Sequence, residues 1–276
     1  MYAIIGNGFD LNLGLETSYK HFIASNEFQA ISHSRLSRAL MKEFHSKHPL
    51  WVDIEIFLDE YLLSISERNE QKRSGVTLDA KSFNEDYLEL KETLFKYLQR
   101  VSQYPIDHNS EAAKFVKKLA NNTIVFNFNF TGSFQRLTDW EDYKNLYYIH
   151  GSLDEGNIIF GAGGTTKNIN KKFRYAKKSF ADNFTTEFHS RLGKSSRETG
   201  RKKLDIFGHS LGVSDHNYFA PMFNQRADAL DITLYHYEEE GKNNLLAEID
   251  EMINMEMHQF RNSVASLNFQ DVSRNQ

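Results

Sequence analysis

The sequence predicts an α/β fold with a mostly parallel sheet. Short apolar, β-branched or aromatic runs recur along the chain, and such nearly continuous runs are typical of parallel strands covered on both faces. Long stretches with helical periodicity separate several of them. Most runs end at a glycine or a polar residue, which is where open parallel sheets bind ligands.

Six runs are candidate strands: Tyr2–Ile5, Thr123–Asn127, Asn145–Ile149, Asn157–Phe160, Leu204–Phe207 and Asp231–Tyr237. Between the first two, apolar residues recur every three to four positions, as on the core face of amphipathic helices. We therefore expect a large helical insertion at about residues 27–120. The chain after about Phe260 is polar, and we expect it to be loose.

A second, smaller and basic helical insertion is expected at about residues 165–203, before the late strands. It contains 12 Lys/Arg and 3 acidic residues, a net charge of +9, so the rest of the chain carries −13. Such a segment can attract phosphates, although most charge runs are solvated helical faces. With only 3 prolines and no Gly/Ser-rich linker, residues 1–276 are expected to form a single domain with two insertions.

The composition excludes several classes of protein. The 276 residues include no cysteine, which rules out disulfide scaffolds, thiolate zinc sites, iron–sulfur clusters and cysteine nucleophiles. No apolar run approaches the roughly 20 residues needed to cross a bilayer, and the N-terminus lacks a basic signal-peptide region. No histidine spacing fits a metal motif. We expect a cytoplasmic protein with no metal and no membrane association.

A Gly-x-Gly loop follows the first strand, in the segment Gly6-Asn7-Gly8-Phe9-Asp10. Glycine lets the backbone turn tightly and approach a phosphate, and a following helix offers N–H groups to an anion. The dinucleotide fingerprint Gly-x-Gly-x-x-Gly is not met, because position 11 is Leu. A nucleotide site and a plain strand-to-helix turn therefore both remain open.

Polar residues also end the next two strands. Asn127, Asn129 and Thr131 follow the second, although asparagine is unfavourable in strands because its amide competes for backbone hydrogen bonds. His150 ends the third strand and precedes Gly151. Because such termini meet at one edge of a parallel sheet, these residues are candidates to face a ligand, with a structural turn as the alternative.

The segment Gly208-His209-Ser210-Leu211-Gly212 fits the nucleophile elbow Gly-x-Ser-x-Gly. A serine hydrolase would need an acid and a histidine after the serine, and Asp215 and His236 follow. His236 lies within a strand-like run, however, and little chain remains for the rest of a hydrolase sheet. The hydrolase hypothesis is therefore the weaker one.

Taken together, these sequence motifs resemble those of the AbiH family of bacterial abortive-infection proteins, which act against phage. The matching motifs, in family order, are Ile5–Leu11, Gly14–Tyr19, Trp51–Glu55, Phe128–Thr131, His150–Ser152 and Gly208–Leu211 with Asp215 and Tyr218-Phe219. Two positions depart from the family pattern: Glu16 stands where proline is expected, and Phe130 stands where relatives usually have tyrosine.

The family is itself similar to a distant branch of the sirtuin-type NAD-binding fold, a Rossmann-like sheet. The resemblance implies that Asn129 and His150 are catalytic, with Asn129 orienting the ribose and the attacking water and His150 acting on a ribose hydroxyl. It implies that the cofactor-binding residues are Gly6, Asn7, Gly8, Phe9, Asp10, Thr131, Gly208, Ser210 and Asp215.

The implied activity is hydrolysis of NAD, as substrate, at the nicotinamide–ribose bond. Sirtuin deacetylases carry a four-cysteine zinc module that this chain lacks, so deacetylation is not expected. A non-catalytic nucleotide-binding sensor or scaffold of a defence system is the alternative, and a nucleic-acid effector using the basic insertion is the third. The expected partners are NAD or a related nucleotide, a phage-derived trigger and further copies of the chain.

Overall fold

The computed structural model describes residues 1–46, 53–70, 80–161, 188–190, 201–226, 230–253 and 267–273. It confirms the predicted α/β class, with six strands that are all parallel in the order β3-β2-β1-β4-β5-β6. The strands are β1 (Tyr2–Ile5), β2 (Ile124–Asn127), β3 (Leu146–Tyr148), β4 (Lys202–Phe207), β5 (Leu230–His236) and β6 (Asn268–Asp271).

The register brings the carboxyl ends of the central strands level. Ile5 at the end of β1 pairs with Asn127 on one side and with Phe207 on the other. Asn127 pairs in turn with Tyr148 at the end of β3. The loops that follow β1, β2, β3 and β4 therefore all start at the same edge of the sheet.

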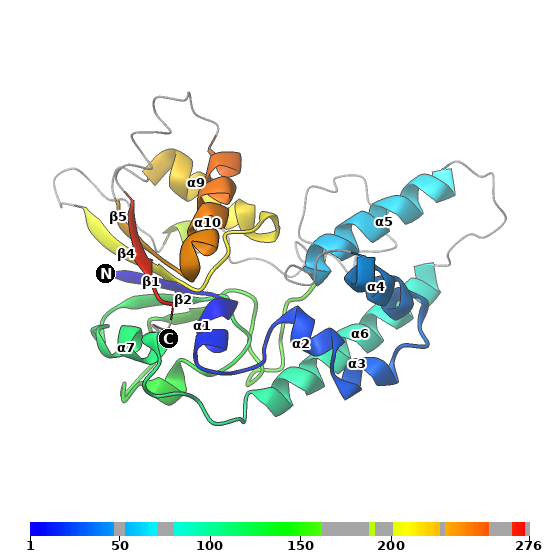
Figure 1. Ribbon diagram of the computed structural model, residues 1–276, viewed down its shortest axis with the longest axis horizontal. Helices are drawn as coiled ribbons and strands as arrows, with labels where there is room; N and C mark the ends of the chain where they lie inside the picture. The colour runs from blue at the N-terminus through cyan, green and yellow to red at the C-terminus, as the bar shows by residue number, and fades with distance from the viewer. Residues whose placement is uncertain are drawn as a thin grey trace.

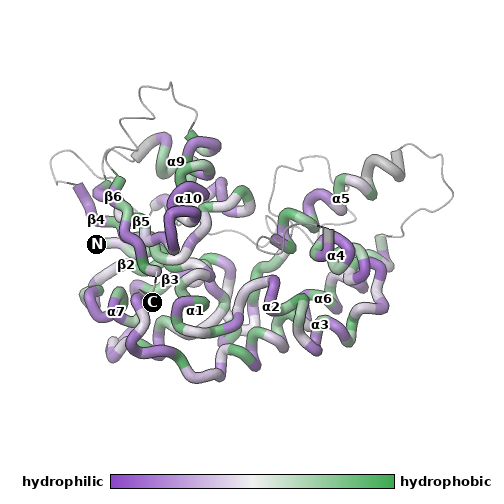
Figure 2. The backbone as a smooth tube through the Cα atoms, viewed as in Figure 1, coloured by the Kyte–Doolittle hydropathy of each residue, from purple (hydrophilic) through white to green (hydrophobic). Residues whose placement is uncertain are grey.

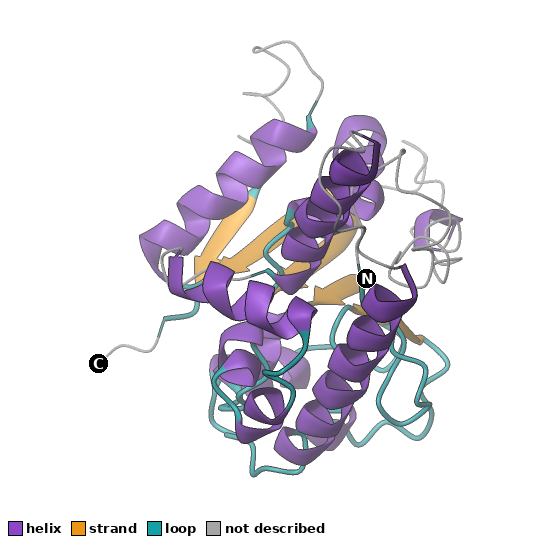
Figure 3. Ribbon diagram, turned by 90° about the vertical axis from the view of Figure 1, so that its right-hand side faces the viewer, coloured by secondary structure: helices purple, strands orange, loops and turns teal. Residues whose placement is uncertain are grey.

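Helices cover both faces of this sheet (Figures 1 and 3). On one face, α1 (Asn7–Asn12) and α7 (Glu111–Lys117) share a core with Ala3 and Ile5. On the other face, α9 (His216–Arg226) and α10 (Glu238–Met252) share a core with Ile4. Alternate residues of β1 are thus buried on opposite faces, which explains why the strand is apolar throughout.

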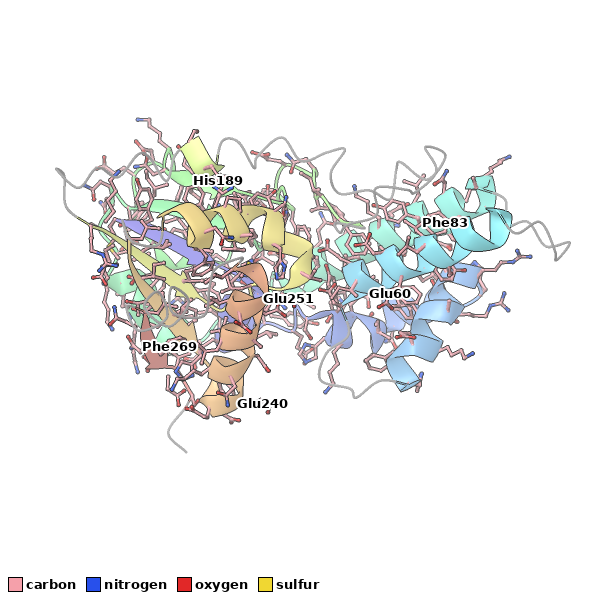
Figure 4. The ribbon with its side chains drawn as sticks, turned by 90° about the horizontal axis from the view of Figure 1, so that it is seen from above. Glu60, Phe83, His189, Glu240, Glu251 and Phe269 are labelled. Atoms are coloured by element: carbon pink, nitrogen blue, oxygen red, sulfur yellow. The ribbon has the colours of Figure 1, made fainter. Side chains whose placement is uncertain are left out.

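A helical lobe lies beside the sheet (Figure 1). It comprises α2 (Tyr19–Ile23), α3 (Asn26–Ala30), α4 (Arg35–Ser46), α5 (Ile54–Glu70) and α6 (Ala80–Val101). The lobe has its own apolar core, and the tube of Figure 2 shows apolar and polar residues alternating along α6. Figure 4 shows both parts from above, with Glu60 and Phe83 in the lobe and Glu240 and Glu251 on α10. The predicted helical region after the first strand is confirmed.

Helix α7 lies within the predicted bounds of the large insertion, yet it packs on the sheet through Phe115, whose ring lies 5.1 Å from that of Phe207. The basic insertion at 165–203 falls outside the described residues except for 188–190 and 201–203. Within the described ranges, no helix combines the length and apolar character needed to cross a membrane. The number of independently folding domains stays a prediction.

Two expectations from the sequence are wrong. Residues 157–160 form no strand; Ile158 and Phe160 are buried in the core of the helical lobe, and the Tyr87 hydroxyl donates to the Phe160 carbonyl. An apolar run indicates burial, but it does not say against which element the residues pack. The chain after about Phe260, which we expected to be loose, also forms a strand. Its residues Asn268–Asp271 are β6, which pairs with β5 through its backbone at the edge of the sheet.

The lobe's core gives a first stability prediction. Leu90 of α6 is 0% exposed within that core, whereas Leu88 on the same helix is 53% exposed. We expect Leu90→Ala to lower the free energy of unfolding by about 2–5 kcal/mol, because it leaves a cavity. Leu88→Ala should change it by about 0.5 kcal/mol or less. Urea denaturation of both variants checks this, and equal losses would contradict the assigned packing.

Candidate functional site

The candidate site lies where the strand order reverses. From β1 the chain adds β2 and β3 on one side, and then β4, β5 and β6 on the other. The loops after β1 and β4 therefore leave the sheet side by side and turn in opposite directions. Ligands of open α/β sheets bind at such a switch point, outside the carboxyl ends of the strands.

Three glycines bring these two loops into direct backbone contact. The Gly8 N–H donates to the Gly208 carbonyl at 2.7 Å, and Gly6 N–H donates to the Phe207 carbonyl at 3.0 Å. A Cβ added at Gly8 would lie 2.8 Å from the Gly208 Cα, and one at Gly6 would lie 2.7 Å from the His209 Cα. This close approach by itself requires glycine at Gly6 and Gly8, so the Gly-x-Gly motif allows the loops after β1 and β4 to pack against each other.

Asp10 is the centre of a buried hydrogen-bond cluster on the α1 side of the site. The Thr131 hydroxyl donates to Asp10 Oδ2 at 2.7 Å, and the Ser133 hydroxyl donates to Oδ1. Asn129 Nδ2 donates to the Gly6 carbonyl at 3.0 Å and lies 3.5 Å from Asp10 Oδ1. Asp10 is only 1% exposed. Its carboxyl group therefore ties the loop after β2 to α1 from within.

The protonation of Asp10 should make stability depend on pH. Burial raises its pKa from 3.8 to about 6, although the Ser133 and Thr131 hydroxyls oppose the shift. Between these pH values the folded state binds a proton that the unfolded state has released, so the free energy of unfolding falls as pH rises. A pKa difference of about two corresponds to about 3 kcal/mol.

We expect Asp10→Asn to remove this decline, because an asparagine stays neutral; its oxygen can accept from one hydroxyl group and its N–H₂ can donate to the oxygen of the other. Urea denaturation of both proteins at several pH values from 4 to about 7 measures the difference between them. That difference should change by up to about 3 kcal/mol across the range. Parallel curves for the two proteins would show that Asp10 does not titrate in this window.

His150, at the end of β3, pairs with a second buried carboxylate. Its Nε2 lies 3.0 Å from Oδ1 of Asp215, which belongs to the short 3-10 helix η4 (Val213–Asp215). The other oxygen, Oδ2, lies 3.5 Å from Nε2 of His209, the residue after Gly208. His150, His209 and Asp215 are 4%, 8% and 9% exposed. One carboxylate is thus shared by two buried imidazoles.

Aromatic rings surround this histidine pair. The Phe128 ring lies edge-on to His150 at 5.2 Å and to His209 at 4.5 Å, and it stacks on Phe219 at 5.4 Å. Tyr218 packs against both Phe128 and His150. Because neighbouring residues of a strand end face opposite ways, Phe128 reaches this cluster whereas Asn129 reaches Asp10. The apolar rings keep the charges of the cluster away from bulk water.

The helical lobe contacts the same region, because α5 contacts η4. Burial raises the pKa of the Tyr19 hydroxyl, and the nearby carboxylates of Glu55, Asp53 and Asp215 raise it further. Glu55 is buried, whereas Asp53 accepts the N–H groups of Glu55 and Ile56 and so caps α5. The start of α5 therefore lies close to Asp215. The residues Asp53 and Glu55 of the Trp51–Glu55 motif lie at the edge of the candidate site.

Other predicted site residues have different surroundings. The exposed Asn7 accepts a hydrogen bond from the Thr17 hydroxyl at 2.6 Å, and the Phe9 ring is fully buried in the core. Ser210 is exposed, and its hydroxyl accepts the Gly212 N–H at 3.3 Å. His209 Nδ1 accepts the Leu211 N–H instead of bonding Ser210. Among the described residues, Ser210 therefore forms no hydrogen bond with a histidine, as a nucleophile elbow would need.

Sequence reasoning missed Ser133 and His209 as site residues. His209 follows a strand in the same way as His150 does, and this parallel was the available signal. Ser133 had no such signal, because its contact with Asp10 joins residues that are 123 positions apart. Among the described residues, no three His, Asp or Glu side chains could hold a metal ion together.

The fold and the site define a class: an open parallel α/β protein with a polar site at its strand-order switch point. A family model described as Bacteriophage abortive infection AbiH matches residues 2–237. The match covers most of the 276 residues and the whole candidate site, so the chain belongs to this family and is an abortive-infection phage defence protein. No match was found among curated proteins or among solved structures.

Proposed function

We propose that this protein binds NAD at the switch point and hydrolyses the bond between nicotinamide and ribose. The observation that carries the proposal is that Asn129 and the His150–Asp215 pair both follow strands at the carboxyl edge of the sheet, where Asn129 also bonds the β1 loop whose glycines contact the β4 loop. Dinucleotides bind sheets of this strand order at that place. The distant resemblance to sirtuin-type folds points to the same ligand.

The reaction needs little from the protein beyond orientation and exclusion of bulk water. Water adds to the anomeric carbon of the ribose, the carbon–nitrogen bond breaks, and its electron pair neutralises the departing nicotinamide. Positive charge develops on the ribose in the transition state. Holding the ribose and one water in the right geometry can supply much of the rate.

Asn129 is suited to that orienting role. Its Nδ2 donates to the Gly6 carbonyl, which fixes the amide plane, and the Asn127 side chain accepts its backbone N–H at 2.8 Å. With Nδ2 engaged, Oδ1 is the acceptor that can bind a ribose hydroxyl or a water. One contact is to the loop after β1 and the other is to the last residue of β2, so both the side chain and the backbone of Asn129 are held at the central strands.

His150 is suited to act as the general base. An imidazole changes its protonation state near neutral pH, and the neighbouring carboxylate stabilises the charged form. The rings of Phe128 and Tyr218 limit its access to bulk water. Gly6, Gly8 and Gly208 place the two loops close together, and the Gly8 N–H is already bonded within the protein, so we assign these residues to shaping the site.

The direct test is to incubate the purified protein with NAD and to measure nicotinamide and ADP-ribose. We expect both products in equal amounts. A rise in melting temperature with NAD but no products would instead favour the non-catalytic nucleotide sensor. Infected cells test for a phage-derived trigger: if the purified protein is inactive, the NAD content of cells that carry it should still fall after infection. Neither binding nor turnover in both settings would contradict the proposal.

A further inference from the structure

The geometry of the shared carboxylate points to a positioning residue. We infer that Asp215, itself held by His209, keeps the ring proton of His150 on Nε2 and so makes Nδ1 the atom that accepts a proton. This inference rests on the proposed function for its catalytic meaning. The proton position itself is a property of the protein alone.

The proton of His209 is fixed by its backbone neighbour. The Leu211 N–H donates a hydrogen bond to His209 Nδ1 at 2.9 Å, so Nδ1 accepts with its lone pair and carries no proton. A neutral imidazole carries one proton, and in His209 that proton is therefore on Nε2, which faces Asp215 Oδ2 at 3.5 Å. Leu211 holds a left-handed φ of 59°, which is unusual for a residue that is not glycine, so the turn that contains this hydrogen bond is constrained.

His150 then faces the remaining oxygen of the same carboxylate. An ionised carboxylate only accepts hydrogen bonds, so the His150 Nε2 that lies 3.0 Å from Oδ1 must carry the proton. The lone pair is left on Nδ1, the ring nitrogen turned away from Asp215. The Phe128 ring also packs perpendicular to the His150 ring at 5.2 Å, and this contact resists rotation of the imidazole.

The proton balance of the proposed reaction follows from this arrangement. A proton of the attacking water, or of the ribose hydroxyl that activates it, moves to His150 Nδ1 as the new carbon–oxygen bond forms. His150 becomes an imidazolium whose charge the Asp215 carboxylate stabilises through Nε2–H. The proton then passes to solvent. Asp215 touches neither substrate nor water in this scheme; it acts through His150.

The test uses Asp215→Asn in the full-length protein. Asparagine offers one acceptor oxygen and one N–H₂ donor in place of two acceptor oxygens. Because His209 keeps its proton on Nε2, it takes the oxygen, and the N–H₂ group faces His150. His150 must then accept at Nε2 and move its proton to Nδ1. A base that has its lone pair on the wrong nitrogen cannot take a proton from the reacting group.

Nitrogen NMR of the histidine rings gives the first readout. We expect the Nε2–H form of His150 in the wild-type protein and the Nδ1–H form in Asp215→Asn. Kinetics with NAD give the second: kcat should fall by about 10²-fold or more while KM stays within about threefold. Glu248→Gln is the matched control, because it alters a neighbouring pair, His216 Nε2 to Glu248 Oε2 at 2.9 Å, without touching Asp215.

The outcomes separate this inference from the proposed function. An Nδ1–H form of His150 in the wild-type protein overturns the inference, and this result needs no variant to fold. An unchanged tautomer in folded Asp215→Asn, or an active wild type whose kcat survives the substitution, also overturns it. If the tautomer switches as expected but the wild type never cleaves NAD, the positioning of His150 stands and the proposed function fails.

Discussion

His150→Ala and Asn129→Ala should each lower the rate of nicotinamide release by roughly 10²–10⁴-fold, the usual effect of removing a positioned acid, base or orienting group. The two substitutions should differ in how the loss of activity divides between kcat and KM. Without His150, the site loses the base that we propose, and kcat should fall with little change in KM. Without Asn129, the site loses an orienting amide, so KM should rise as well.

His108→Ala is the control for this pair, because His108 is exposed on the loop before α7. It should keep the wild-type rate. Melting temperatures of all three variants show whether the fold is intact. Full activity in folded His150→Ala and Asn129→Ala would mean that NAD is not hydrolysed at the carboxyl ends of β2 and β3, and the site assignment would be wrong.

Gly208→Ala should produce a large loss of stability. Gly208 has a φ of +67°, and an added Cβ would lie 2.2 Å from the Phe9 nitrogen and 2.5 Å from the Gly8 carbonyl carbon. Both contacts are with backbone atoms, which cannot move aside without shifting α1. The left-handed conformation costs a side chain about 1–2 kcal/mol, and overpacking adds about 1–3 kcal/mol or more. We expect a total loss of about 2–5 kcal/mol or more.

Gly156→Ala separates the two costs, because Gly156 has the same φ of +67° and nothing within 4 Å of an added Cβ. It should lose only the conformational part, about 1–2 kcal/mol. Denaturant unfolding of both variants gives the difference. Equal losses would show that the loops after β1 and β4 do not approach as closely as the glycine contact requires.

Much of the fold was predictable because the physics that sets it is local. A buried strand between two helical layers is typically apolar on both faces, and β1 shows this in sequence, whereas β4 and β5 each include an aspartate among their apolar residues. The helices of the lobe show their core faces by periodicity, as α6 does. Strand β6 has no such signal, since Asn268–Asp271 lies at an edge and needs only backbone pairing.

The site was predictable in its parts and unpredictable in its pairings. Glycine, asparagine and histidine at strand ends identify Gly6, Asn129 and His150 from sequence alone. No local pattern shows that Asp215 pairs with His150 across 65 positions, or that Asp10 is buried under two hydroxyl groups. Such contacts depend on strand order, and strand order is a property of the whole chain. The structure shows Asp215 in contact with a histidine, and its predicted contact with the cofactor stays a prediction.

The central claim is that water cleaves NAD at this site, and hydrolysis in water enriched in oxygen-18 tests it most directly. Mass spectrometry of the products of the full-length protein should show ADP-ribose with one heavy oxygen on the anomeric carbon and nicotinamide with none. His150→Ala should yield the same labelled product at a rate lower by roughly 10²–10⁴-fold. Intact NAD after prolonged incubation with the wild-type protein, alone and in extracts of infected cells, would contradict the account.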